Sequence, residues 1–460
     1  MSVHPPVAGR GAFRTPDGPS DAELSLCVHC GFCLSYCPTY LELGQEPDSP
    51  RGRLQLMKAL AEERVQPTPR VLQHFDRCLQ CRACETACPS LVPYGRLMEA
   101  TRADLFQQGT MLSGRRRWLW RLVMRGVFPH PRRLRALGSV LWLVQRSGLQ
   151  GLARRTGLLA RIAPPLARLD ALAPDLRRPF FRPADVRRYG TRGAPRATAA
   201  MLTGCVMPLS HPETHHATAR TLARNGVRVT APAGQVCCGA LHAHGGDVET
   251  ARALARRNID AFSIDDSSGG DEAPDAIIVN AAGCGSHMKE YGHLLRDDPD
   301  YAARADDFAA RVRDVSEYLL AIGFDAPAGA LERSVTYQDS CHLVHAQRVK
   351  DAPRALLRSI PGLDLREMRT PDRCCGSAGL YSILQGKLSG AILRDKMADV
   401  AQTEADQVCS ANPGCLLQLD AGLRLYVASD GAPMRSAHVI DLLDESYRAA
   451  EGDDYARADR

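Results

Sequence analysis

The feature that most constrains this chain is a twelve-residue cysteine motif that occurs twice in its first hundred residues. The first copy runs from Cys27 to Pro38 and the second from Cys78 to Pro89, and both read C-x2-C-x2-C-x3-C-P. Three thiolates at this spacing wrap one face of a cubane [4Fe–4S] cluster, and the proline turns the fourth cysteine toward a neighbouring cluster. The pair of motifs therefore predicts two adjacent [4Fe–4S] clusters whose ligands cross over.

Structural zinc is the alternative use of C-x2-C pairs, but a four-ligand zinc site leaves the third cysteine and the C-P ending of each motif without a role. A cluster with four cysteine ligands has no open position for a substrate, so we expect electron relay here and no catalytic residue. The predicted ligand sets are Cys27, Cys30, Cys33 and Cys88 for one cluster, and Cys78, Cys81, Cys84 and Cys37 for the other.

A second cysteine pattern is also duplicated, in the C-terminal half of the chain. Each copy has a single cysteine, then Cys-Cys-Gly after 32 or 33 residues, then Gly-Cys. Adjacent cysteines rarely suit one mononuclear site, but they can hold different irons of a larger cluster. An additional cluster in this region and a region without metal both stay open, and the cysteines of the pattern are candidate metal ligands. The candidates are Cys205, Cys237, Cys238 and Cys284 in the first copy, and Cys341, Cys374, Cys375 and Cys415 in the second.

The sequence around this second pattern predicts parallel α/β structure. Short β-rich runs such as 198–204 and 275–283, repeated as 334–340 and 405–411, alternate with helical segments, and the cysteines fall at strand ends. Loops at strand ends are where open α/β sheets bind ligands. The predicted fold class is mixed α+β. Its parts are a disordered lead-in (1–22), a helical two-cluster ferredoxin-like domain (23–100), an Arg-rich helical linker (101–196), two α/β repeats (197–330 and 331–447) and a flexible tail (448–460).

Residues 115–196 hold twenty arginines, no lysine and three acidic residues, a local net charge of +17 in a chain whose overall charge is +6. Arginine interleaved with Trp and Leu is typical of an amphipathic helix on a membrane surface or in a partner's groove, and helices packed on the rest of the protein are the alternative. The chain has no apolar run long enough to span a bilayer. We expect a cytoplasmic protein with peripheral contact at the cytoplasmic face of the inner membrane. A nucleic-acid surface would leave the C-P endings unexplained, so no nucleic-acid partner is expected.

Particular stretches make a family resemblance specific: CVHCGFCLSYCPTY, PRGR at 50–53, CLQCRACETACPS, CCGALHAHGG, CHLVHAQRV and CCGSAGLYS. Together they resemble the iron–sulfur subunits of glycolate oxidase (glycolate dehydrogenase), within the wider heterodisulfide-reductase-like family of CCG-domain proteins. The resemblance implies an electron-transfer subunit that accepts electrons from flavin-containing partner subunits and passes them to quinone or another membrane carrier. The FAD or FMN, and the oxidation of the 2-hydroxy acid itself, would belong to those partners.

Two other functions stay open. A sibling complex could serve lactate or glycerol 3-phosphate, and the CCG region could act as a heterodisulfide-reductase-like thiol or disulfide enzyme. The second is disfavoured because the wider family's CCG motif ends in C-x2-C, which this chain lacks. The extra Cys409, upstream of Cys415, is predicted to be an ordinary buried cysteine. Histidines that follow the cysteines are predicted to bond to backbone groups in loops, and ligation of iron or handling of quinone protons is the alternative. They are His211, His215, His216, His242, His244, His342 and His345.

Overall fold

The structure is a computed structural model that describes residues 11–111, 114–157, 161–162, 170, 173–263, 274–427, 434–452 and 455. The predicted lead-in and tail therefore lie partly outside the described residues. Within the described part, residues 11–20 pack on the first domain: Phe13 is 3% exposed, and the Thr15 hydroxyl donates to Asp104 at 2.7 Å. This differs from the disorder expected for residues 1–22, because Phe13 adds to the apolar core of that domain.

The first domain is helical and surrounds a core that includes Met57, Leu60, Phe75 and Met98. Proline occupies the first turn of three of its helices, and serine or threonine side chains cap two of them, which fixes where each helix begins. Its elements are α1 (Asp21–Leu24), α2 (Pro38–Leu43), η1 (Glu46–Asp48), α3 (Pro50–Ala61), α4 (Pro69–Asp76), α5 (Ala83–Thr86) and α6 (Tyr94–Gln107). Helix α6 crosses the predicted boundary at residue 100.

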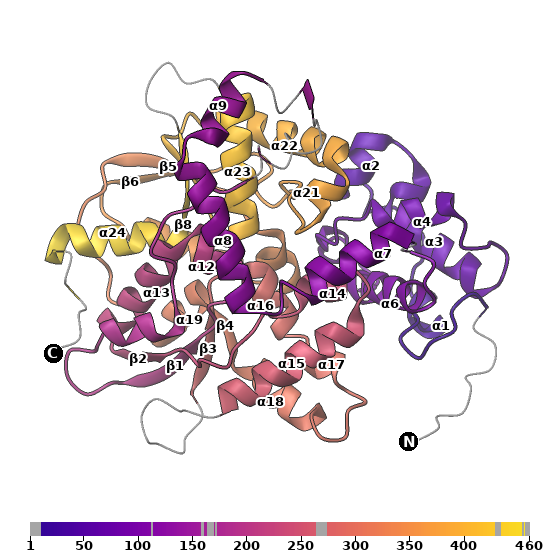
Figure 1. Cartoon of the computed structure of the whole chain (residues 1–460), viewed down its shortest axis with the longest axis horizontal. Coiled ribbons are helices and arrows are strands. Elements are labelled where there is room, and N and C mark those ends of the chain that lie inside the picture. The colour runs from indigo at the N-terminus through magenta and orange to yellow at the C-terminus, as the bar shows by residue number, and fades with distance from the viewer. Residues whose placement is uncertain are drawn as a thin grey trace.

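The Arg-rich segment is largely helical up to Arg155, whereas residues 173–182 and 189–196 form no helix. Figure 1 shows its helices running from the first domain, at the right, across the two α/β repeats. Trp120 packs against Phe106 with ring centroids 5.9 Å apart, whereas Trp118 is 62% exposed. The segment thus contains both packed and solvent-facing surfaces. Its elements are α7 (Gly114–Trp120), the π-helix η2 (Arg121–Arg125), α8 (Pro131–Arg146), α9 (Leu149–Arg155) and η3 (Pro183–Arg188).

The first α/β repeat contains a four-stranded parallel sheet with strand order β2-β1-β3-β4. The strands are β1 (Ala197–Met201), β2 (Val227–Thr230), β3 (Ala276–Val279) and β4 (Val312–Asp314). The helices are α12 (Met207–Ser210), α13 (Pro212–Arg224), α14 (Ala240–His244), α15 (Val248–Ser263), α16 (Ala282–Met288), α17 (Tyr291–Leu294), α18 (Ala302–Arg311) and α19 (Val315–Ile322).

The second repeat has the same topology, with strand order β6-β5-β7-β8 and all pairs parallel. The duplication seen in the cysteine spacing is therefore a duplication of the fold. The strands are β5 (Arg333–Tyr337), β6 (Leu363–Arg366), β7 (Gln407–Ser410) and β8 (Arg435–His438). The helices are the π-helix η4 (His342–Ala346), α20 (Asp351–Arg358), α21 (Tyr381–Leu384), α22 (Gly386–Ala401), α23 (Pro413–Tyr426) and α24 (Val439–Glu451).

The two repeats share one apolar core. A single cluster of buried side chains contains Leu222 and Ile278 from the first repeat together with Tyr337 and Leu443 from the second. Ion pairs close its rim, among them Arg220 with Asp444 at 2.7 Å. The repeats therefore form one packed unit rather than two separate bodies. None of the helices in the described ranges is long and apolar enough to cross a membrane.

Candidate iron–sulfur sites

The two cysteine motifs of the first domain form loops with the same local conformation. The third residue of each motif is left-handed, His29 with φ 57° and Gln80 with φ 55°. The fifth residue is also left-handed, Gly31 with φ 87° and Arg82 with φ 62°. Such residues turn the chain sharply, which lets three closely spaced thiols face one point. The first motif lies between α1 and α2, and the second runs from the loop after α4 through α5 to Cys88.

The first three cysteines of one motif share a cavity with the last cysteine of the other. The cavity is lined by Cys27, Cys30, Cys33 and Cys88, which we call the outer site. Arg51 and Cys84 line the same cavity. Burial is the main reason why the pKa of the Cys33 thiol rises to about 11. All sixteen cysteines of the predicted sites lie in the described residues, and Cys30 alone among them is exposed.

The other four cysteines of the first domain form what we call the inner site: Cys37, Cys78, Cys81 and Cys84. All four are buried, with exposures of 7% or 8%. Burial raises the pKa of the Cys81 and Cys84 thiols well above the usual value, and nearby thiolates, including Cys37 and Cys78, raise it further. Cys37 thus lies among the cysteines of the second motif. This is the grouping that crossed ligands require.

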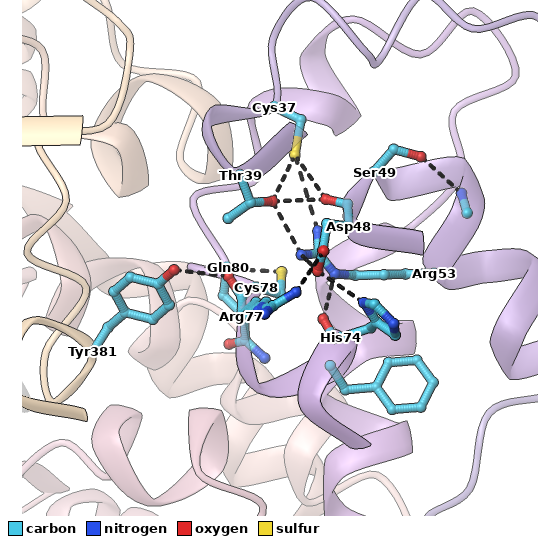
Figure 2. Close-up of polar contacts among 12 residues, drawn as sticks. Cys37, Thr39, Asp48, Ser49, Arg53, His74, Arg77, Cys78, Gln80 and Tyr381 are labelled. Carbon is cyan, nitrogen blue, oxygen red and sulfur yellow. Dashed lines mark hydrogen bonds and ion pairs between the residues drawn. The ribbon is translucent and has the colours of Figure 1, made fainter. Parts of the chain in front are cut away.

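Hydrogen-bond donors surround the sulfurs of the inner site. The Gln80 backbone N–H and the Tyr94 hydroxyl donate to Cys78 Sγ at 3.4 and 3.6 Å. Thr39 Oγ1 lies 3.2 Å from Cys37 Sγ, and Arg53 Nη1 donates to the same sulfur at 3.9 Å. Figure 2 shows the contacts of Thr39 and Arg53 with Cys37, and Gln80 beside Cys78. Donors of this kind stabilise thiolates, which are the form that binds iron.

Each α/β repeat brings its four predicted cysteines together at the carboxyl ends of its first three strands. Cys205 follows β1, the Cys237–Cys238 pair follows β2, and Cys284 lies in α16 after β3. Cys341 follows β5, the Cys374–Cys375 pair follows β6, and Cys415 lies in α23 after β7. We call these groups the first tetrad and the second tetrad.

Contacts between sulfurs shift the thiol pKa values within each tetrad. In the first tetrad, hydrogen bonds from Cys205 and Cys238 lower the pKa of Cys237, and contact with Cys237 raises that of its two neighbours. In the second tetrad, contact with Cys374 raises the pKa of Cys375 to about 12, and contact with Cys375 raises that of Cys415. Most of these thiols are therefore protonated until a metal replaces the proton.

A glycine after each cysteine pair makes the tetrads possible. Gly239 has φ 93° and Gly376 has φ 87°, a region that favours glycine. A Cβ at Gly376 would lie 2.8 Å from the Ser389 carbonyl oxygen. The third residue of the Cys-Cys-Gly motif is thus required by the turn that carries the chain from the cysteine pair into the next helix.

Cys409 lies outside both tetrads. It belongs to β7 and is fully buried in the core shared by the two repeats, which agrees with its predicted role as an ordinary core cysteine. The prediction for the histidines holds only in part. His242, His342 and His345 contact backbone carbonyl oxygens. The other four contact side chains: His211 with Ser210, His215 with Asn280, His216 with Tyr189 and His244 with Glu99.

The residues present fit cubane clusters better than single metal ions. Among the described residues, no three Cys, His, Asp or Glu side chains converge as the ligands of one ion do. A cubane places each thiolate on a different iron, so its ligands lie farther apart than those of one ion. Four cysteines grouped in a buried shell of hydrogen-bond donors meet that requirement at the inner site, and the cavity at the outer site meets it as well.

The sites follow one another through the molecule because the first domain docks on the cysteine-bearing edge of the repeats. Cys81 of the inner site shares an apolar cluster with Cys374 and Cys341 of the second tetrad. Tyr381 donates to the Arg77 carbonyl oxygen at 3.0 Å. On the first repeat, Glu290 accepts from Arg82 at 2.7 Å. The outer site, the inner site and the second tetrad therefore succeed one another without an intervening solvent layer.

The sequence analysis did not identify the polar network behind Cys37. It consists of Thr39, Asp48, Arg53, His74 and Arg77, and Figure 2 shows Arg53 at its centre. The available signal was the PRGR stretch at 50–53, which was noted only as a mark of the family. Spacing along the chain does not distinguish a buried arginine from one that reaches solvent. In this stretch the Arg51 side chain is 29% exposed, whereas that of Arg53 is buried.

Comparison with known families assigns all three parts of the chain. Residues 23–92 match the 4Fe-4S dicluster domain, and residues 115–173 match the glycolate oxidase iron-sulfur subunit, linker region. Residues 199–289 and 335–420 each match the cysteine-rich (CCG) domain. The predicted family resemblance and fold class are thereby confirmed.

Curated relatives agree with these matches. A probable glycolate oxidase iron-sulfur subunit of Bacillus subtilis (strain 168) is 41% identical over 93% of this chain and 94% of its own length. The glycolate oxidase iron-sulfur subunit of Escherichia coli (strain K12) is 34% identical over 89% of this chain and 92% of its own. Lactate utilization protein A of Geobacillus kaustophilus (strain HTA426) is 29% identical, over 53% of this chain and 97% of its own length.

Proposed function

Because this chain belongs to the family of glycolate oxidase iron–sulfur subunits, we propose that it is the electron-transfer subunit of a glycolate-oxidising complex. In this proposal a flavin-containing partner oxidises the 2-hydroxy acid, and this chain carries the electrons one at a time toward quinone or another membrane carrier. The observation that supports it is the unbroken succession of cysteine sites from the exposed Cys30 to the buried second tetrad.

The outer and inner sites are each proposed to hold one [4Fe–4S] cluster, with the crossed ligand sets described above. The clusters supply one-electron chemistry when bound. The chain contributes the thiolates, the donors that stabilise them and an apolar shell that excludes water, including Leu54, Phe75 and Leu97. With all four positions of each cluster filled by cysteine, the chain offers a route for electrons and no place for a substrate.

The two tetrads are proposed to hold additional iron–sulfur clusters. Eight thiols, gathered in two matching groups at strand ends, are buried or half-buried in the core of each repeat. Uncharged thiols in such numbers contribute little to stability. When iron is bound, its positive charge offsets the negative charge of the thiolates. The second tetrad adjoins the inner site, so a cluster there would extend the route into the repeats.

We infer that the flavin partner docks over the outer site. Electron transfer requires close approach, and Cys30 is the exposed cysteine of that site. Large apolar side chains surround it and face solvent: Val28 is 67% exposed, Phe32 64% and Leu91 77%. Exposed apolar groups concentrated at one place indicate an interaction surface.

We infer that the helices of the linker rest on an anionic membrane surface. Ten exposed large apolar side chains lie between Trp118 and Ile162, and Val140 and Leu143 on α8 are each 61% exposed. Exposed arginines, among them Arg132, Arg133 and Arg146, stand at both ends of α8. An apolar face flanked by arginine complements a bilayer with anionic head groups.

A lactate-oxidising complex is the second candidate, because the relatives include proteins named for lactate utilization. Those relatives match about half of this chain, whereas the linker match and the nearly full-length matches belong to glycolate oxidase subunits. Glycolate is therefore the favoured donor.

The test is substrate-driven reduction of the complex, purified anaerobically with its flavin partner. Glycolate should reduce the clusters, seen by low-temperature EPR as a spin-coupled signal of neighbouring [4Fe–4S] clusters, while lactate and glycerol 3-phosphate at the same concentration should reduce them at least tenfold more slowly. Two clusters account for about eight irons per chain, and filled tetrads would raise that number to about sixteen. Zinc without acid-labile sulfide would refute the proposal.

A further inference from the structure

The buried guanidinium of Arg53 stands behind the inner site. Its side chain is 1% exposed, yet each of its three nitrogens has an acceptor. Nε donates to the His74 carbonyl oxygen at 2.7 Å, Nη2 to Thr39 Oγ1 at 3.0 Å and Nη1 to Cys37 Sγ at 3.9 Å. Figure 2 shows that these contacts tie α3, α4 and the start of α2 to the sulfur of Cys37.

The charge of Arg53 is only partly matched by protein carboxylates. Its contact with Asp48 Oδ1 is long, at 3.5 Å. The same carboxylate also pairs with Arg77 Nη1 at 2.9 Å and lies 3.0 Å from His74 Nδ1. The single carboxylate of Asp48 thus pairs with the guanidinium groups of both Arg53 and Arg77. A net positive charge therefore remains in this buried site. A buried charge of this kind is costly unless a counter-charge stands beside it.

The thiolates of the inner site are that counter-charge. A cluster held by four thiolates is an anion, and reduction adds one more negative charge. Exclusion of water disfavours the added charge and lowers the reduction potential, whereas a nearby cation favours it and raises the potential. The inner site has both features, since its four cysteines are buried and Arg53 contacts one of them.

We propose that Arg53 is a positioning residue that sets the reduction potential of the inner cluster. It holds Cys37 in place and supplies a buried positive charge that offsets the effect of burial, so that electrons can move from the outer to the inner cluster. The inference rests on the proposed function, because it requires that both sites hold clusters.

Arg51 provides a matched control in the same stretch of chain. It adjoins the outer site and donates to the His29 carbonyl oxygen at 3.2 Å. Its side chain is 29% exposed, and it pairs with Glu46 through two contacts, at 2.7 and 3.3 Å. Solvent and a carboxylate of its own therefore screen its charge. Removal of Arg51 should affect cluster potentials far less than removal of Arg53.

The experiment is a redox titration of the full-length protein, followed by EPR, with iron and acid-labile sulfide counted on each sample. In Arg53→Gln, the equilibrium constant for reduction of the inner cluster should fall at least tenfold, which is 59 mV for a one-electron couple. Arg53→Lys keeps the charge and should stay within threefold of wild type. Asp48→Asn removes the competing carboxylate and should shift the inner potential upward. Arg51→Gln should change the equilibrium constant for reduction of the inner cluster less than threefold.

Opposite shifts in Arg53→Gln and Asp48→Asn would support the proposal, because general loss of packing cannot produce both signs. An unchanged inner potential in Arg53→Gln with full iron content would overturn it. If Arg53→Gln loses iron, the test rests on Asp48→Asn and Arg53→Lys. An upward shift of the inner potential in Asp48→Asn together with a wild-type potential in Arg53→Lys supports the proposal. Any other result overturns the proposal. Absence of two [4Fe–4S] signals in the wild-type protein would instead refute the proposed function.

Discussion

At the scale of single residues, two buried cysteines differ in the groups that surround them. Cys37 is 7% exposed, accepts from Arg53 Nη1 at 3.9 Å and lies 3.2 Å from Thr39 Oγ1. Cys409 is fully buried among apolar side chains of the shared core. Burial alone does not separate a ligand from a packing residue. Polar contacts to sulfur do, because a thiolate needs donors and a core thiol does not.

Serine at these two positions should therefore have opposite effects on iron content. Cys37→Ser removes a ligand of the inner cluster, so we expect the loss of about four irons per chain. Cys409→Ser should retain all the iron, although a hydroxyl placed in the apolar core lowers the free energy of unfolding by about 1–3 kcal/mol. Iron and sulfide counts on anaerobically purified protein check this. Equal iron loss in both variants would contradict the assignment of Cys37.

At the scale of elements, α8 shows how little of a helix needs to be buried for it to be held in place. Leu134 and Gly138, one turn apart, face the protein, and Gly138 approaches Leu209 and Phe180 closely. Leu137, Val140 and Val144, at helical spacing, face outward and are 40% to 61% exposed. Such a face gains free energy when a membrane or another apolar surface covers it.

Glutamate on that outer face should weaken membrane binding. Each apolar side chain that enters the interface contributes about 1.5–3 kcal/mol, so Val140→Glu is expected to lower partitioning onto vesicles containing phosphatidylglycerol at least tenfold. Flotation with the purified protein measures it, and binding should also fall when the vesicles are purely zwitterionic or when salt is raised. Leu320→Glu, on an exposed face of α19, is the control. If Val140→Glu and wild type float alike, α8 does not contact lipid.

At the scale of the whole molecule, a few buried side chains join the first domain to the repeats. Arg102, on α6, donates from Nη2 to the carbonyl oxygens of Phe75 and Cys78 at 2.5 and 2.8 Å. Its Nη1 donates to the carbonyl oxygen of His244 in α14 at 2.9 Å. One side chain thus connects the loop that carries Cys78 with the first repeat.

Truncation of this side chain should loosen the docking of the first domain. Arg102→Ala removes three hydrogen bonds to carbonyl oxygens, of which, in the described part of the chain, only that of Phe75 keeps a second donor, the Cys78 N–H, and we expect a loss of about 3 kcal/mol in unfolding free energy. Limited proteolysis should then cut the segment after α6 faster than in wild type. Arg96→Ala serves for comparison, since Arg96 is 42% exposed and lies 3.9 Å from Glu290. Equal cleavage rates in the two variants would show that Arg102 does not hold the domains together.

Much of this protein follows from short-range patterns in the chain. The cysteine motifs place three ligands within seven residues, so spacing alone predicts the cluster type. The central strands β1, β3, β5 and β7 overlap the runs 198–204, 275–283, 334–340 and 405–411 that the sequence predicts as strands. The edge strands β4 and β8 are three and four residues long, with sequences VRD and RSAH. No local sequence pattern predicts β4 and β8, because they become strands only by pairing with a central strand.

Intervals along the chain predict which residues could bind iron and that the chain contains two duplications, because both depend on spacing alone. Folding brings particular cysteines together, leaves Cys30 exposed and buries Arg53, the second arginine of the PRGR stretch, beside Cys37. The physical reason is that charge and burial act through space. Arg51 and Arg53 are two residues apart and chemically identical, yet solvent and Glu46 screen the first, while the second faces Cys37 in a site without water.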